Sequence, residues 1–167
     1  LVRKLYIYKA VDVAQEYYVA ITFDRDRGMP VLLISNVGGV DIESNADKLE
    51  RYWFDMKHGI TTEITAYVQA QLGFSDAEMA VISHILHQMV KLFREKDATL
   101  LELNPLVRTP EGHFVCLDAK FTFDIRLGSD NRRFLAWRNG CLMTKMSMRQ
   151  PRLVFPMFVL TGTLEML

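Results

Sequence analysis

Apolar and polar residues alternate along the first third of the chain in the manner of β-strands. Residues 5–11, 16–24 and 31–35 are rich in β-branched, aromatic and aliphatic residues, which favour strands. The stretch 25–30 contains glycine and proline and is predicted to be a turn. Residues 32–34 are apolar without a break, which indicates a strand buried on both faces. Strands joined by short turns predict an antiparallel sheet.

The apolar spacing changes to a helical period after residue 60. Residues 60–72 are predicted to form a helix that ends at Gly73, and its apolar face comprises Ile60, Ile64, Tyr67, Val68 and Leu72. A capping box from Ser75 to Glu78 begins a second helix, which extends to about Arg94. Its apolar stripe comprises Ile82, Ile85, Leu86, Met89, Val90 and Phe93. Both helices are expected to pack against the sheet, so the predicted fold class is α+β.

Residues 99–124 are predicted to form a β-hairpin. Two runs rich in Leu, Val and Phe flank a short polar loop, Thr109–His113, which contains a proline and a glycine. A loop with these limits pairs Arg108 with Phe114. Counting outward from that pair gives the register of the two arms.

The register places two polar pairs across the hairpin. Asn104 lies opposite Asp118 and Glu102 lies opposite Lys120, with Glu102 and Asn104 on one face of their arm. Alternation also predicts that Cys116, Asp118 and Lys120 share a face of the other arm. Directly opposed side chains have Cβ atoms about 5 Å apart. An amide oxygen and a carboxylate at that separation can both reach Mg²⁺, which prefers oxygen ligands, so Asn104 and Asp118 are candidate metal ligands.

The same pattern also fits an ordinary sheet surface. Asparagine before proline often ends a strand, as at Asn104, and oppositely charged pairs often lie on a solvated sheet face. The spacing alone leaves both interpretations open.

The composition narrows the class of protein. At 167 residues, half of them hydrophobic, the chain is long enough for one sizeable core. A net charge of zero argues against disorder and against a nucleic-acid-binding surface. Cys116 and Cys141 provide no disulfide framework and indicate a reducing compartment, and Cys116 is predicted to be a packing residue. His84 and His87 lack a third ligand, so they are expected to have a solvated or core-edge role. No apolar run is long enough to span a bilayer, so no membrane association is expected.

The zero net charge conceals an uneven distribution. Residues 1–124 contain 13 Lys and Arg against 18 Asp and Glu, whereas residues 125–167 contain 7 against 2. We therefore place a boundary near Asp124, between a first domain and a tail of unassigned structure. The apolar run 153–160 in that tail fits an aggregation-prone strand, a partner surface or the product of a shifted reading frame. Because the chain begins at Leu1 rather than methionine, we expect it to be a fragment or a processed product.

Four stretches resemble the ATP-grasp domain in the β subunit of succinate–CoA ligase, and they occur in the family's order. Residues 102–105 match its E-x-N-P motif, and residues 118–120 match its D-A-K motif. The other two stretches are 17–21, Tyr-Tyr-Val-Ala-Ile, and 37–43, Val-Gly-Gly-Val-Asp-Ile-Glu. The resemblance covers roughly residues 5–124, and four matches in order are more specific than any one of them.

The resemblance implies that residues 1–124 are the C-terminal half of an ATP-grasp domain. It implies Mg²⁺ held by Asn104 and Asp118, and a bound ATP or GTP contacted by Glu16. In the complete enzyme, an α subunit with a phosphorylated histidine acts with the β subunit to join succinate and CoA into succinyl-CoA. The implied compartment is the mitochondrial matrix in a eukaryote and the cytoplasm in a bacterium. The chain alone is expected to have no ligase turnover.

Departures from the family pattern keep other functions open. Lys9 stands where the family usually has Glu, and Val37 replaces another usual Glu. Glu16 also fits the start of a strand at the water edge, with no ligand. Gly38 and Gly39 are interpreted as loop residues and not as ligands. The alternatives are a non-catalytic remnant or interaction domain of the same fold, and the β subunit of a malate–CoA ligase.

Overall fold

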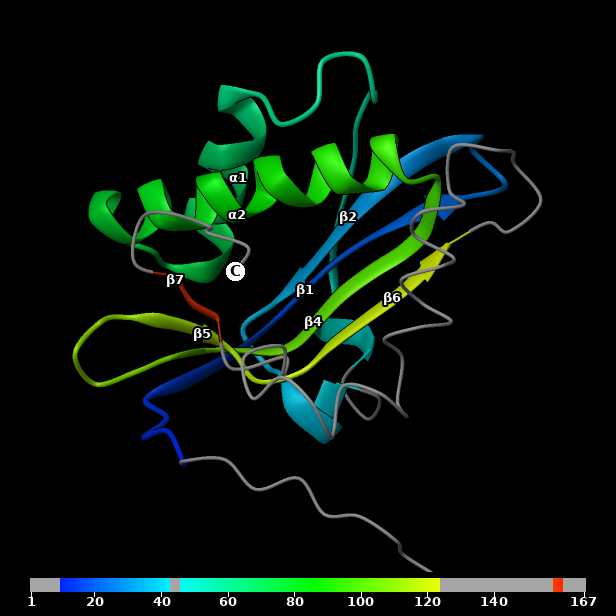
Figure 1. Ribbon diagram of the computed structural model, residues 1–167. Coiled ribbons are helices and arrows are strands. Elements are labelled where there is room, and N and C mark those ends of the chain that lie inside the picture. Colours follow the sequence, from blue (N-terminus) through cyan, green and yellow to red (C-terminus); the bar gives the residue numbers. More distant parts are fainter. Residues whose placement is uncertain (1–9, 43–45, 124–157, 161–167) are drawn as a thin grey trace, which may run out of the picture.

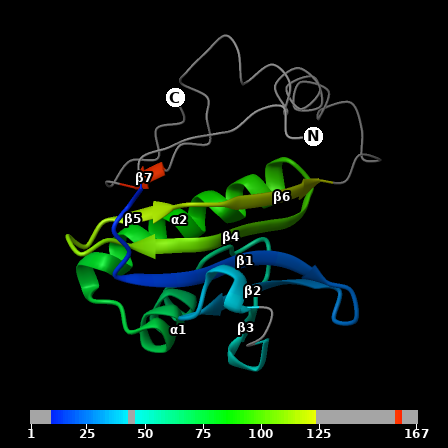
Figure 2. The same cartoon turned by 90° about the horizontal axis from the view of Figure 1, so that it is seen from below.

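The computed structural model describes residues 10–42, 46–123 and 158–160, and a seven-stranded antiparallel sheet is the central element of these residues. The strand order is β3-β2-β1-β4-β5-β7, and β6 also pairs with β4. The strands are β1 (Gln15–Asp24), β2 (Met29–Ser35), β3 (Glu50–Trp53), β4 (Ala98–Arg108), β5 (Phe114–Cys116), β6 (Ala119–Phe123) and β7 (Phe158–Leu160). Two helices, α1 (Thr62–Leu72) and α2 (Asp76–Glu95), lie over one face of the sheet (Figure 1, Figure 2). This arrangement confirms the predicted α+β fold.

Strand β1 runs through the middle of the sheet between β2 and β4. The strands predicted at 16–24 and 31–35 correspond to β1 and β2, which begin one and two residues earlier. Residues 32–34 contact apolar clusters on both faces of the sheet, as the unbroken apolar run predicts.

Two parts of the strand pattern differ from the sequence-based expectation. Most of the strand predicted at 5–11 lies outside the described residues, and residues 10 and 11 are not in a strand. Strand β3 is not predicted, because its four residues include Glu50 and Arg51 and show no apolar alternation. Between β2 and β3 the chain forms two short 3₁₀ helices, η1 (Gly39–Ile42) and η2 (Ala46–Lys48).

A bulge interrupts the pairing of β1 with β4. Tyr17 pairs with Leu106 and Val19 pairs with Leu103, so β4 has one more residue than β1 between these pairs. The interruption includes Pro105, which has no backbone N–H to donate to the ladder. Leu103 and Leu106 consequently both face the helices, although simple alternation would put them on opposite faces.

Local capping determines where the helices begin and end. The Thr61 hydroxyl accepts a hydrogen bond from the Ile64 amide, so α1 begins two residues later than the apolar period alone predicts. Helix α1 ends at Gly73, which has a left-handed φ of 69°. The predicted capping box is confirmed, since Ser75 and Glu78 each bind the other's backbone amide with a side-chain oxygen.

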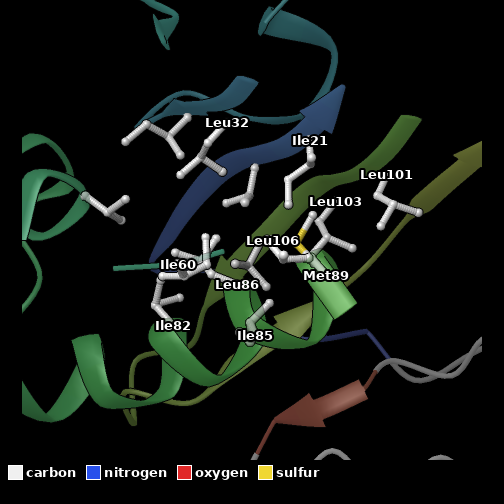
Figure 3. Packing of buried hydrophobic residues seen from close by; sticks show 14 of the residues in the cluster. Ile21, Leu32, Ile60, Ile82, Ile85, Leu86, Met89, Leu101, Leu103 and Leu106 are labelled. Carbon is white, nitrogen blue, oxygen red and sulfur yellow. The ribbon is translucent and has the colours of Figure 1, made fainter. Parts of the chain in front are cut away.

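The core lies between the helices and the sheet. Ile82, Ile85, Leu86 and Met89 of α2 point toward Ile21, Leu101, Leu103 and Leu106 of the central strands (Figure 3). All six residues of the predicted α2 stripe are buried. Of the five residues predicted to form the apolar face of the first helix, four are buried, and one of these, Ile60, lies just before α1. The opposite face of the sheet has a much smaller apolar cluster, which comprises Tyr18, Ala20 and Ile42 with Leu33, Leu49 and Leu100 at its edge.

The predicted tail, 125–167, is described only at β7. Strand β7 pairs antiparallel with β5 and extends the sheet beyond it. This pairing fits the strand interpretation of the apolar run 153–160, while the rest of the tail and the boundary near Asp124 lie outside the described residues. In the described part of the chain, no helix has the length and apolar character needed to cross a membrane.

Candidate functional site

The hairpin that carries the two candidate metal ligands has the predicted register. Arg108 pairs with Phe114, and Glu102 pairs with Lys120. Between these pairs, the Asn104 amide donates a hydrogen bond to the Asp118 carbonyl oxygen at 3.0 Å. The hairpin therefore brings the backbones of Asn104 and Asp118 into direct opposition, as the sequence predicts.

One prediction about the faces of this hairpin is wrong. Cys116 is buried in the core beneath the helices, and Ala119 and Phe121 contact the same core. Lys120 therefore lies on the other face of the sheet and does not share a face with Cys116. The alternation changes at Leu117–Asp118, between β5 and β6, opposite the interruption in β4. A sequence count that assumes one uninterrupted strand cannot detect this change.

The side-chain amide of Asn104 is held on both sides. Its Oδ1 accepts a hydrogen bond from the backbone amide of Gly39 at 2.7 Å. Its Nδ2 donates toward Oε1 of Glu102 at 3.5 Å. Because the Gly39 amide needs an acceptor and the Glu102 carboxylate needs a donor, both neighbours specify the same orientation of the amide. Glu102 and Asn104 thus lie on one face, as predicted.

The carboxylate of Glu16 lies against the same glycine. A Cβ atom built on Gly39 would be 2.7 Å from Glu16 Oε2, so a side chain at Gly39 would displace the carboxylate. Gly39 also has a φ of +68°, which L-residues rarely adopt. The structure therefore brings together Glu16 and Asn104, two of the three predicted site residues, at one glycine.

Gly38 makes an equally close approach to the backbone of β1. A Cβ atom at Gly38 would be 2.8 Å from the Tyr17 carbonyl oxygen. Both glycines thus allow the loop after β2 to lie directly on the start of β1. The sequence marks them as loop residues, but it does not show what the loop packs against.

Two residues that the sequence analysis does not single out hold this loop in place. The Gln15 side chain donates hydrogen bonds to the Asn36 carbonyl at 2.8 Å and to the Glu16 carbonyl at 3.0 Å. The buried Ser35 hydroxyl accepts a hydrogen bond from the Val37 amide at 3.0 Å. Neither residue belongs to a motif, so their role follows only from the folded arrangement.

Asp118, the third predicted site residue, has an exposed side chain. Its Oδ1 accepts a hydrogen bond from the adjacent Ala119 amide at 2.9 Å, which leaves the other carboxylate oxygen available to a ligand. Amide and carboxylate oxygens are the donors that Mg²⁺ prefers, so the residues at this position fit the ion. That Asn104 and Asp118 bind one cation, and that Glu16 contacts a nucleotide, stay predictions.

Burial keeps two nearby titratable groups neutral. Burial, with the adjacent Glu102 charge, raises the pKa of Tyr18 to about 12. Burial raises the pKa of the Cys116 thiol to about 12 as well, and the charge of Asp118 acts in the same direction. Cys116 is therefore a packing residue, as predicted, and its thiol is a poor nucleophile near neutral pH.

The two histidines of α2 do not form a metal centre with other described residues. Within the described ranges no group of three His, Cys, Asp or Glu residues could hold a metal ion. His87 is exposed, and its Nδ1 lies 2.7 Å from the Ser83 carbonyl oxygen of the same helix. His84 is partly buried, at the edge of the packed part of α2.

Comparisons with known proteins agree with the fold and the motifs. Residues 1–108 match the ATP-grasp domain family. The chain is 37% identical over 124 residues to the β subunit of a hydrogenosomal, ADP-forming succinate–CoA ligase from Neocallimastix frontalis, covering 72% of this chain and 28% of that protein. It is 38% identical over 128 residues to the corresponding subunit from Salinibacter ruber, covering 74% of this chain and 32% of that protein.

A solved structure supports the fold independently. ATP citrate lyase from Methanothrix soehngenii aligns with a TM-score of 0.50 and 17% sequence identity, covering 80% of this chain and 29% of that chain. At 17% identity, this likeness is one of fold. The chain thus spans about a third of the length of the curated relatives it matches.

Proposed function

The chain belongs to the ATP-grasp domain family and is related to the β subunits of succinate–CoA ligases, and from this membership we propose that it forms a magnesium–nucleotide-binding wall of such a ligase. In this proposal Asn104 and Asp118 hold Mg²⁺, and Glu16 contacts the bound ATP or GTP. The ion, when bound, offsets the negative charge of the phosphate oxygens.

The observation that carries the proposal is the convergence of three motifs at one end of β1. Glu16 is the second residue of that strand, the loop with Gly38 and Gly39 lies on the start of the strand, and Asn104 accepts a hydrogen bond from this glycine loop. Asp118 is directly opposite Asn104 across the hairpin. An amide oxygen has two lone pairs, so Asn104 Oδ1 can accept from Gly39 and still bind a cation.

We further propose that the whole reaction joins succinate and CoA at the expense of a nucleoside triphosphate, with an α subunit as partner. This chain spans about a third of its relatives and carries one wall of the proposed site. One wall cannot enclose the nucleotide and exclude water, so the chain alone should bind without turnover. Normal turnover by the purified chain with an α subunit would contradict this part of the proposal. The proposed compartment is the one in which the ligase acts, the mitochondrial matrix or the bacterial cytoplasm.

Calorimetric titration with ATP and GTP, each with and without Mg²⁺, tests the proposal. We expect Asp118→Ala to weaken the magnesium-dependent binding by about tenfold or more. Even the loss of a residue that only hydrogen-bonds a metal ligand often lowers metal affinity by that factor. Asp26→Ala is the matched control, because Asp26 is an exposed carboxylate in the turn at the other end of β1. Equal binding by both variants, or no magnesium-dependent binding by the parent, would instead favour a remnant that has lost nucleotide binding.

A further inference from the structure

Gly39 lies between the proposed metal ligand Asn104 and the proposed nucleotide contact Glu16. Its N–H donates to Asn104 Oδ1, a contact between residues 65 positions apart in the chain. The missing side chain of Gly39 leaves the space that the Glu16 carboxylate occupies. One residue thus contacts both a proposed metal ligand and a proposed nucleotide contact.

We propose that Gly39 is a positioning residue, which orients Asn104 and Glu16 toward the bound magnesium nucleotide. This inference rests on the proposed function and extends it from the ligands to the loop behind them. The positioning requires two properties of Gly39 together: its N–H as a donor, and the absence of a Cβ atom.

The N–H determines which end of the Asn104 amide is presented. An asparagine side chain can rotate so that either its oxygen or its NH₂ group faces a given neighbour, and only the oxygen can bind a cation. The Gly39 N–H stabilises the rotamer in which Oδ1 faces the loop, and Glu102 receives the NH₂ group. The second lone pair of Oδ1 is then left for the ion. The position of the glycine loop and the availability of this oxygen are consequently coupled.

The missing side chain determines where Glu16 can lie. A methyl group at Gly39 would come within 2.7 Å of Glu16 Oε2, the far end of a flexible side chain. The side chain can swing away at little cost in stability, but the carboxylate then leaves the position beside the loop. Apart from the strain of a left-handed alanine, which Gly39→Ala adds to folding, the substitution should therefore act on ligand binding.

Gly28 supplies a matched control for the backbone strain. Its φ is +66°, against +68° at Gly39, and a Cβ atom at Gly28 would meet nothing within 4 Å. Gly28→Ala thus introduces the same left-handed alanine without displacing a neighbour. It lies in the turn after β1, far along the strand from Glu16.

Two measurements on the full chain test the inference. In titrations with Mg²⁺ and ATP, we expect Gly39→Ala to bind about 3- to 10-fold more weakly than the parent, because displacing the Glu16 carboxylate removes the contribution of about one hydrogen bond to the ligand. Gly28→Ala should bind as the parent does, although thermal denaturation should show the two alanine variants to be similarly destabilised. Equal affinity of the two alanine variants would overturn the inference and leave the proposed function intact.

The second measurement does not depend on ligand binding. Hydrogen exchange of the Gly39 amide, followed by nuclear magnetic resonance, should be slow in the parent and faster in Asn104→Ala. Unchanged exchange in Asn104→Ala would overturn the positioning of Asn104. If the parent shows no magnesium-dependent binding, the proposed function fails, and the exchange measurement alone then decides whether Gly39 orients Asn104.

Discussion

The guanidinium of Arg108 lies 2.8 Å from the carboxylate of Glu78, joining the last residue of β4 to the first turn of α2. Glu78 also accepts hydrogen bonds from the backbone amide and the hydroxyl of Ser75. One carboxylate therefore caps a helix and fixes that helix to the hairpin arm that carries Asn104. Both partners are partly buried, and the Glu78 carboxylate is held at the same time by Ser75, which strengthens the contact relative to an isolated surface ion pair.

Replacing Glu78 should weaken the fold measurably. We expect Glu78→Ala to lower the free energy of unfolding by about 1–3 kcal/mol, because it removes both a capping-box acceptor and a charged hydrogen bond. Urea denaturation measures this difference. Glu63→Ala provides the control, since Glu63 is an exposed glutamate in the first turn of α1. Equal losses in the two variants would mean that the contact with Arg108 and Ser75 adds nothing.

The Glu78 carboxylate should also make the stability of the fold depend on pH in the acid range. The Ser75 hydroxyl and amide, and then Arg108, lower the pKa of Glu78 from 4.5 to about 2. A lowered pKa in the folded state stabilises the fold above the unfolded value, and this contribution is lost as the pH falls from about 4.5 toward 2. The stability advantage of the parent over Glu78→Gln should therefore shrink across this range. A constant difference between the two proteins from pH 6 to pH 2.5 would contradict the assignment.

The Cys116 thiol should be unreactive in the folded protein. Its pKa of about 12 leaves almost no thiolate at pH 8, and the side chain is buried. In a Cys141→Ser background, we expect Cys116 to react with a disulfide reagent roughly 100-fold or more slowly in the native state than in urea. Absorbance of the released thiol measures both rates. Fast reaction of the native protein would show that β5 opens readily or that the thiol is not buried.

Gly38 should tolerate a side chain less well than Gly28. At Gly38 a Cβ atom would meet the Tyr17 backbone, which cannot move aside without disturbing the sheet. We expect Gly38→Ala to cost about 1–3 kcal/mol in the free energy of unfolding, the usual range for overpacking. Gly28→Ala should cost about 1 kcal/mol, from its left-handed backbone alone. A smaller loss at Gly38 than at Gly28 would show that the loop can move away from β1.

Much of the secondary structure follows from local pattern. The Ser75–Glu78 capping box, the stop at Gly73 and the pairing of Arg108 with Phe114 each depend on residues close together in the chain. Such features are set by nearest-neighbour sterics and by hydrogen bonds within a few residues. The short edge strand β3 could not be predicted, because its pairing with β2 and not its own composition makes it a strand.

Part of the candidate site can likewise be predicted from the sequence, and part of it cannot. Asn104 and Asp118 can be selected from motifs, Glu16 follows from the family resemblance, and the hairpin register can be counted from its loop. The bulge beside Pro105 changes which residues share a face, and it is visible only when β4 is seen against β1. For this reason the predicted shared face of Cys116 and Lys120 is wrong, while the opposition of Asn104 and Asp118 is correct.

The sequence by itself determined the family, the two helices and the hairpin that places Asn104 across from Asp118. Only the tertiary structure decided that Gly39 would donate to Asn104 and make room for Glu16. The physical reason is that these contacts join segments separated by long stretches of chain. Periodicity and capping act over a few residues, whereas the meeting of a glycine loop, a strand start and a bulge depends on how the whole sheet packs against its helices.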